Sequence, residues 1–244
     1  FMHRPSAMDE PQAPLAHHWM DATHISFGVA TAGLFTRKVR LEASAFNGHE
    51  PDEERWGFEP IELNSYSARL TVNPTANWSM TAGYGVLDNP EEVVPAETVR
   101  RFVASALYGR GLGVDGQLAA AAVYGQNSDD EHGTSQSALV EGEAVLDRWN
   151  TVFGRVELAR KNAHDLNLQG FPDQTLFNVG SVSLGYIRDF ARGRGLTFGI
   201  GARGTLNRVP SDLEATYGSR TPWGGMVFLR MRPSLMRGMP GMQH

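Results

Sequence analysis

The chain contains no cysteine among its 244 residues, which excludes disulfide bonds and thiolate metal sites. It also lacks any run of the roughly 18 consecutive apolar residues that a membrane-spanning helix requires. The formal net charge of -5 argues against nucleic acid as a partner. A signal peptide is missing and the first residue is Phe1, so we expect the sequence to be part of a longer protein.

What the sequence has instead is alternation of apolar and polar residues. In segment 39–45, Val39 and Leu41 alternate with Arg40 and Glu42, and a period of two with one apolar face predicts a β-strand. Eleven segments show this pattern, with lengths near the ten residues that a tilted strand needs to cross a bilayer. They are 23–35, 39–46, 65–72, 78–86, 99–108, 117–124, 137–146, 150–160, 176–190, 196–203 and 223–232.

The connections between these segments alternate between short and long. The short ones are 36–38, 73–77, 109–116, 147–148 and 191–195, and the long ones are 47–64, 88–98, 125–136, 161–175 and 205–222. An up-and-down antiparallel sheet sends every second connection to the same end. The rhythm therefore predicts tight turns at one end and long loops at the other.

The polar faces carry charges that a dry core would tolerate only if each were paired. The expected inward-facing set is Arg40, Glu42, Arg69, Arg101, Glu141, Glu143, Arg155, Glu157 and Arg203. A watery or salt-bridged lumen accommodates these charges while lipid contacts the apolar faces. The alternative is a soluble one-sided sheet, which would need something to cover its apolar face.

These features resemble the outer-membrane β-barrel proteins of Gram-negative bacteria, over residues 23–232. The resemblance implies an all-β, up-and-down antiparallel transmembrane barrel with eleven visible strands. Barrels of this kind usually have an even strand number, so twelve or more are expected in the full protein. Aromatic residues near both ends of the strands fit the two interfaces of a membrane. The expected organisation is an external segment at 1–22, the barrel at 23–232 and a Met-rich periplasmic tail at 233–244.

The resemblance implies a location in the bacterial outer membrane, with the long loops outside and the C-terminus in the periplasm. The first functional hypothesis is a narrow, non-enzymatic pore for small polar solutes or ions, in which charges of both signs set selectivity. The alternative is a structural or binding barrel with a plugged lumen, whose loops dock a partner or a metal. Expected partners are outer-membrane lipid and lipopolysaccharide, and other envelope proteins.

Two further patterns suggest specific chemistry. The group His17, His18, Met20 and Asp21 and the tail residues Met236, Met239, Met242 and His244 offer ligands suited to copper or zinc. Outer-membrane copper-resistance proteins, which the chain resembles in this respect, also combine a barrel with Met/His-rich segments. No other cofactor is expected, although acidic clusters in the long loops offer carboxylates to divalent cations.

The sequence His24-Ile25-Ser26 resembles the His-x-Ser pair of outer-membrane lipid A deacylases. It leaves a membrane-embedded hydrolase as a third hypothesis. In those enzymes the pair must face the bilayer. Here the lipid-facing set is expected to be Ile25 and its alternating neighbours, which would turn His24 and Ser26 inward.

Overall fold

A single curved antiparallel sheet makes up most of the molecule. The computed structural model describes residues 4–15, 17–20, 28–49, 60–88, 90, 98–129, 133–163, 166–193 and 195–233. The strands are β1 (Ala30–Phe35), β2 (Val39–Phe46), β3 (Ser65–Thr75), β4 (Trp78–Asp88), β5 (Thr98–Leu112), β6 (Gly116–Asp129), β7 (Gly133–Val145), β8 (Asn150–Asn162), β9 (Leu176–Gly193), β10 (Leu196–Arg208) and β11 (Trp223–Pro233). Short helical turns are η1 (Pro5–Ala7), α1 (His17–Met20), η2 (Ser211–Leu213) and α2 (Glu214–Tyr217).

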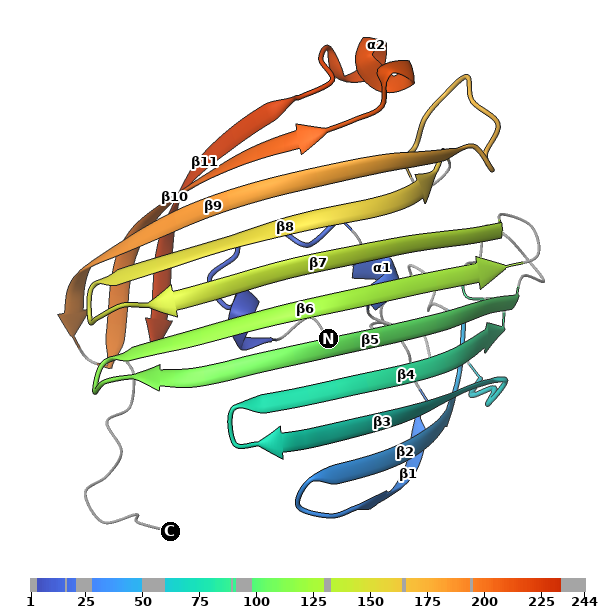
Figure 1. The fold of residues 1–244 in the computed structure, drawn as a ribbon, viewed down its shortest axis with the longest axis horizontal. Helices are drawn as coiled ribbons and strands as arrows, with labels where there is room; N and C mark the ends of the chain where they lie inside the picture. The colour runs from blue at the N-terminus through green and yellow to red at the C-terminus, as the bar shows by residue number, and fades with distance from the viewer. Residues whose placement is uncertain are drawn as a thin grey trace.

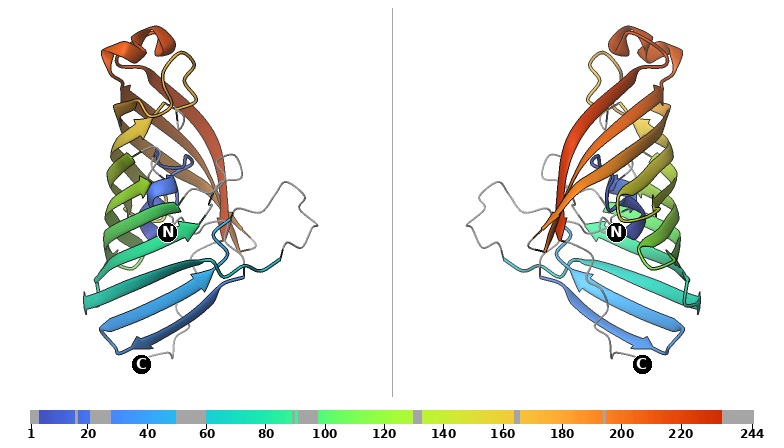
Figure 2. Two further views of the ribbon diagram at one scale, coloured as in Figure 1. Left: turned by 90° about the vertical axis from the view of Figure 1, so that its right-hand side faces the viewer. Right: turned by 90° about the vertical axis from the view of Figure 1, so that its left-hand side faces the viewer.

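The eleven strands lie side by side in chain order, each antiparallel to the next. This confirms the predicted up-and-down topology, and β1 and β11 form the two edges of the sheet. The sheet curls into a trough, and the N-terminal residues lie within its curve (Figures 1 and 2). Among the described residues, no helix is long and apolar enough to cross a membrane.

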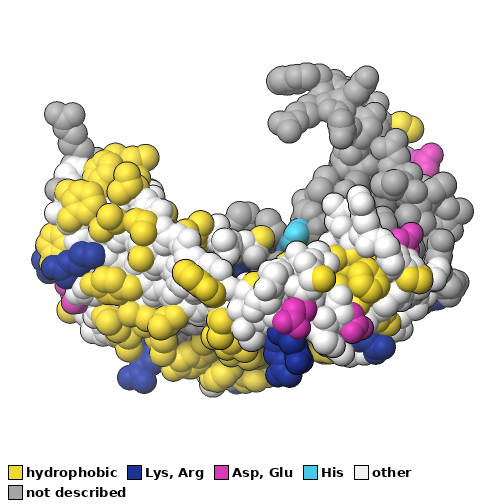
Figure 3. Space-filling model, turned by 90° about the horizontal axis from the view of Figure 1, so that it is seen from above, with side chains coloured by type: hydrophobic (Ala, Val, Ile, Leu, Met, Phe, Trp, Pro, Cys, Tyr) yellow, Lys and Arg dark blue, Asp and Glu magenta, His cyan; other side chains and the backbone are white. Residues whose placement is uncertain are grey.

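Side-chain polarity divides the sheet into two faces. The apolar residues of the alternating pattern are exposed: Leu41, Leu70, Met80, Val140, Leu184 and Ile200 show 43–67% of their surface. Seen from above, the convex face of the trough is largely hydrophobic (Figure 3). The residues that alternate with them point to the concave face, where Glu141 and Arg155 are buried, whereas Arg40 and Arg69 each expose 52% of their side chain. The alternation in the sequence therefore corresponds to two faces of different polarity.

Tight turns join the strands at one end, and local hydrogen bonds explain their shape. In the β7–β8 turn, Asp147 Oδ1 accepts hydrogen bonds from the backbone N–H groups of Trp149 at 2.7 Å and Asn150 at 2.8 Å. These N–H groups and the Asn150 side chain hold the pKa of the Asp147 carboxyl below its usual value. The carboxylate therefore fixes the turn in its charged form.

One of the predicted long loops is wrong. Segment 125–136 was expected to be a loop, but β6 runs to Asp129 and β7 begins at Gly133, so most of it is paired strand. Side chains across this pair explain the extension: Tyr124 Oη donates to Gln126 and Gln136, and Ser128 and Thr134 hydroxyls lie 2.8 Å apart. Polar residues here continue the ladder where the sequence pattern indicated a loop.

Two aromatic residues at the long-loop ends of strands lie inside, although the sequence pattern placed them at a membrane interface. Phe46 and Phe177 are 1% and 4% exposed, because each belongs to the alternating residues of its strand that point to the concave face. Trp223, Tyr66 and Phe190 are exposed on the outer face, as the aromatic pattern predicted.

Candidate functional site

The concave face is the candidate site, and it has two distinct halves. The described residues 4–15 and 17–20 run across the half formed by β6–β11, whereas the half formed by β1–β5 borders a groove. The N-terminal segment was expected to be external to the barrel. The described residues 4–15 and 17–20 instead lie against the inner wall, because their polar groups match the charges of that wall one by one.

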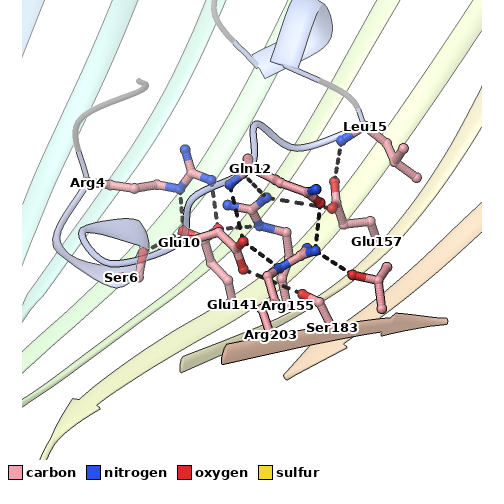
Figure 4. A network of polar contacts seen from close by, with 11 residues as sticks. Arg4, Ser6, Glu10, Gln12, Leu15, Glu141, Arg155, Glu157, Ser183 and Arg203 are labelled. Atoms are coloured by element: carbon pink, nitrogen blue, oxygen red, sulfur yellow. Dashed lines mark hydrogen bonds and ion pairs between the residues drawn. The ribbon is translucent and has the colours of Figure 1, made fainter. Parts of the chain in front are cut away.

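Glu141 on β7 is the centre of the first group of contacts (Figure 4). Its carboxylate accepts hydrogen bonds from Arg4 Nη2 at 2.7 Å, from Ser6 Oγ at 2.7 Å and from Arg155 Nε on β8 at 2.8 Å. Arg4 also binds the second carboxylate oxygen through Nε. All four residues are at most 6% exposed, so one strand carboxylate joins two guanidinium groups away from solvent.

Three strand side chains bind the backbone of the segment. The N–H of Asp9 donates to Glu143 at 2.9 Å, and the N–H of Leu15 donates to Glu157 at 2.6 Å. Arg155 Nη1 donates to the carbonyl oxygen of Gln12 at 3.0 Å. These contacts satisfy backbone groups that have no partner strand, and they hold the segment against the wall.

Acidic side chains of the segment bind arginines of the last two strands. Glu10 lies 2.6 Å from Arg203 Nε on β10, and Gln12 Oε1 accepts from Arg203 Nη1 at 2.6 Å. Asp9 pairs with Arg230 on β11. Arginines of the strands thus bind acidic side chains of the segment. Carboxylates of the strands bind hydrogen-bond donors of the segment. Such buried pairs contribute little net stability, but removing one partner is costly.

Sequence reasoning missed three charged residues of this wall. Asp189 on β9 is 1% exposed and lies 2.7 Å from Arg230 Nη2 and 3.5 Å from Arg232 Nη2. A signal was present, because Arg230 and Arg232 alternate with the outward Leu229 and Met231. The partner Asp9 had no such signal, since it precedes every strand.

Apolar contacts hold the segment at the long-loop end. Trp19 is 2% exposed, donates from Nε1 to Ser135 Oγ at 2.6 Å and has Lys161 Nζ 4.9 Å from its ring centroid. It belongs to a buried cluster with Met20, Phe177 and Leu213. Gly125 on β6 permits this close approach, because a Cβ there would lie 2.5 Å from the carbonyl oxygen of Trp19.

The short-turn end of the same half is filled by side chains of the strands. Phe153 and Ile187 are 2% and 0% exposed, and the Phe153 and Phe228 rings lie 6.4 Å apart. Gly185 makes room for Phe153, since a Cβ at this position would come within 2.1 Å of the ring. This half of the lumen is therefore closed by the segment and by the wall itself.

Between the described residues of the other half lies a groove of about 670 Å³. Arg40 and Arg69 both contact Glu42 Oε2, at 2.8 and 2.9 Å, and each exposes 52% of its side chain. Arg101 donates to Asn127 at 2.7 Å. Hydroxyl groups line the rest of the wall, from Thr31, Ser44, Ser67, Thr71, Ser79, Thr81 and Ser105. Among the described residues that line the groove, three guanidinium groups against one carboxylate give a positive balance.

The metal hypothesis stays a prediction. His17 and Met20 lie on α1, where Met20 is 4% exposed and packs in the apolar cluster. The His18 side chain, Asp21, Met236, Met239, Met242 and His244 lie outside the described residues, as do His24, Ile25 and Ser26. Within the described ranges, no group of three or more His, Asp or Glu residues is arranged to hold a metal ion.

Comparison with known proteins gives matches at the level of structure alone. No family model matches the chain, and no curated protein is significantly similar. One similar structure is an anion-selective porin from Comamonas acidovorans, with 12% identity, a TM-score of 0.47, and coverage of 83% of this chain and 55% of that chain. Another is a variant of OccD1 (OprD), with 11% identity, a TM-score of 0.42, and coverage of 84% and 68%. The chain thus spans about 55% of the length of the first of them.

Proposed function

We propose that the chain forms the wall of an outer-membrane β-barrel that conducts small polar solutes or ions along the β1–β5 groove. The observation that carries this proposal is the division of the sheet into an apolar convex face and a charged concave face that is only half covered. Lipid accepts the first face, and water accepts the second. A soluble sheet would expose the apolar face of all eleven strands to water.

The N-terminal segment makes the proposed pore narrow. It fills the lumen along β6–β11, so passage is confined to the groove beside Arg40, Glu42, Arg69 and Arg101. Because guanidinium groups outnumber carboxylates there, the groove favours anions over cations. Glu141, Glu143, Arg155, Glu157 and Arg203, which were also expected to set selectivity, are used to hold the segment.

The second candidate is a structural or binding barrel without conductance. The same N-terminal segment favours this candidate, because Arg4, Glu10 and other residues of the segment pair with most charged side chains on the concave face of β6–β11. Both candidates are non-enzymatic and share the proposed location and orientation, with the long loops outside. They differ in whether the groove is continuous across the membrane.

Ion selectivity in planar bilayers tests the proposal. We expect a channel whose reversal potential in a salt gradient indicates anion preference. Arg40→Gln with Arg69→Gln should shift it toward cations, because Glu42 then remains without its two neighbours. The matched control is Arg148→Gln with Arg188→Gln, which removes two positive charges from a turn and from the outer face. Absence of conductance would favour the second candidate, and an equal shift in the control would refute the role of the groove.

A further inference from the structure

Two exposed arginines lie at one level of the outer face, just above the exposed apolar residues of the strands. Arg160 and Arg208 lie at the long-loop ends of β8 and β10, and both are exposed. Within the described part of the chain, neither side chain takes part in a hydrogen bond or an ion pair. Most other arginines of the sheet have partners, so these two cations have a different role from those of the lumen.

Strand register brings the two arginines close together. Arg160 is opposite Asn178 on β9, and Arg208 is opposite Gly180 on the other side of the same strand. Asn178 and Gly180 are successive residues of the outer face of β9. With neighbouring strands roughly 4.8 Å apart, the arginines flank a gap occupied by a small amide side chain and a glycine. Arginine side chains are long enough for both guanidinium groups to reach the space above this gap.

The residues directly below are apolar and highly exposed. Leu158 on β8 shows 66% of its surface, Leu206 on β10 shows 53%, and Trp223 on β11, opposite Leu206, shows 82%. Exposed Arg220 adds a third positive charge nearby, because its carbonyl oxygen accepts from the N–H of Val209, next to Arg208. Aliphatic and aromatic side chains thus lie at one level, directly below the cationic ones.

We infer that Arg160, Asn178 and Arg208 form a binding site for the phosphate of a phosphorylated, acylated lipid in the outer leaflet. The belt below accepts acyl chains, and Trp223 lies at the level where aromatic rings meet head groups. The guanidinium groups and the amide above it donate to phosphate oxygens, in the geometry that arginine provides for this anion. A protein partner would need an apolar surface matching the lipid-facing belt, whereas a lipid meets both requirements with one molecule.

This inference rests on the proposed function, since it requires the convex face to lie in a bilayer. It adds a specific lipid site to the general expectation of outer-membrane lipid as a partner. The site is independent of the lumen, because Arg160 and Arg208 point away from the groove and from the N-terminal segment. Its failure and the failure of the pore are therefore separable.

Native mass spectrometry of the full chain, reconstituted with diphosphorylated lipid A and then extracted in mild detergent, tests the site. We expect the wild-type protein to retain diphosphorylated lipid A at least tenfold more than the same lipid without phosphates. Arg160→Gln with Arg208→Gln should abolish this difference. The matched control is Arg37→Gln with Arg110→Gln, which removes two exposed positive charges at the short-turn end and should leave the difference intact.

The outcomes separate the two ideas. A protein that does not insert into vesicles would overturn the proposed function and the lipid site with it. A protein that inserts, but retains both lipids equally or loses the preference in the control as well, would overturn the lipid site alone.

Discussion

The N-terminal segment should be held in the lumen by Glu10, and Glu10→Gln tests this most sharply. The Glu10 carboxylate lies 2.6 Å from Arg203 Nε, and the two side chains are 3% and 4% exposed. Removing one charge of a buried pair costs about 3–5 kcal/mol. Because Gln12 still binds Arg203, we take the lower end, about 3 kcal/mol. The cost arises because Arg203 stays buried without its partner, and it exists only while the segment lies in the lumen. The population of protein with the segment displaced from the lumen should therefore rise on the order of 100-fold.

Thiol modification measures that population, because the chain has no cysteine of its own. Ser183 on β9 is 6% exposed and lies under the segment, 3.5 Å from Glu10 Oε2. In a Ser183→Cys background, a charged thiol reagent should react slowly, and Glu10→Gln should accelerate the reaction on the order of 100-fold if reclosing is fast. Ser67→Cys, in the open groove, should react rapidly in both backgrounds.

Glu214→Gln is the matched control, since Glu214 begins the exposed α2. It should leave the reaction of Ser183→Cys unchanged. A rate at Ser183→Cys that Glu10→Gln leaves within about threefold would refute the reasoning, because 3 kcal/mol corresponds to a much larger factor.

Three further predictions concern the sheet itself. Leu70→Arg places a charge on the outer face, proposed to contact lipid, and should destabilise the folded protein by roughly 2–4 kcal/mol. Arg69→Ala, on the groove side, should be tolerated. Heat resistance of the folded protein on gels compares the two variants, and equal tolerance would count against the assigned orientation. Gly185→Val should impair folding, because even a Cβ would lie 2.1 Å from the Phe153 ring. The control is Gly204→Val, at a position with open space around its Cβ. Refolding yields that do not differ between the two variants would contradict the packing described for Phe153. The Asp147 turn should be stable at neutral pH and loosen only in acid, because the folded-state pKa of the carboxyl is lowered and the stabilisation is lost as the pH falls through it. The protection factors of the Trp149 and Asn150 amides, relative to their intrinsic exchange rates, should fall in acid in the wild type and not in Asp147→Asn. Wild-type protection factors that do not change with pH would be evidence against it.

Much of the sheet could be predicted from the sequence because one physical rule governs it. Alternation of residues such as Leu41 and Glu42 sets the face on which each side chain lies, and a slip of one residue would move every side chain of a strand to the other face. The starts of β2 and β8 were predicted to the residue, since Thr36 and Asp147 fix the preceding turns. The extension of β6 and β7 was missed because Gln126, Ser128 and their partners are polar on the outer face as well.

The plugging of the lumen could not be predicted in the same way. Arg4, Asp9 and Glu10 precede the strands and show no periodicity, so only the fold brings them beside Glu141, Arg230 and Arg203. The alternation places these charges on the same face of the sheet, but it carries no information on what they bind. The division into a closed half and an open half is therefore a property of tertiary structure.

Single-channel recording of a Ser67→Cys variant tests the central claim most directly. Ser67 lines the groove, so a bulky thiol reagent should reduce the current in a discrete step. Ala202→Cys, on the outer face of β10, should show no such step. A conducting protein that is indifferent to modification at Ser67→Cys, or a folded and inserted protein with no current at all, would contradict the account.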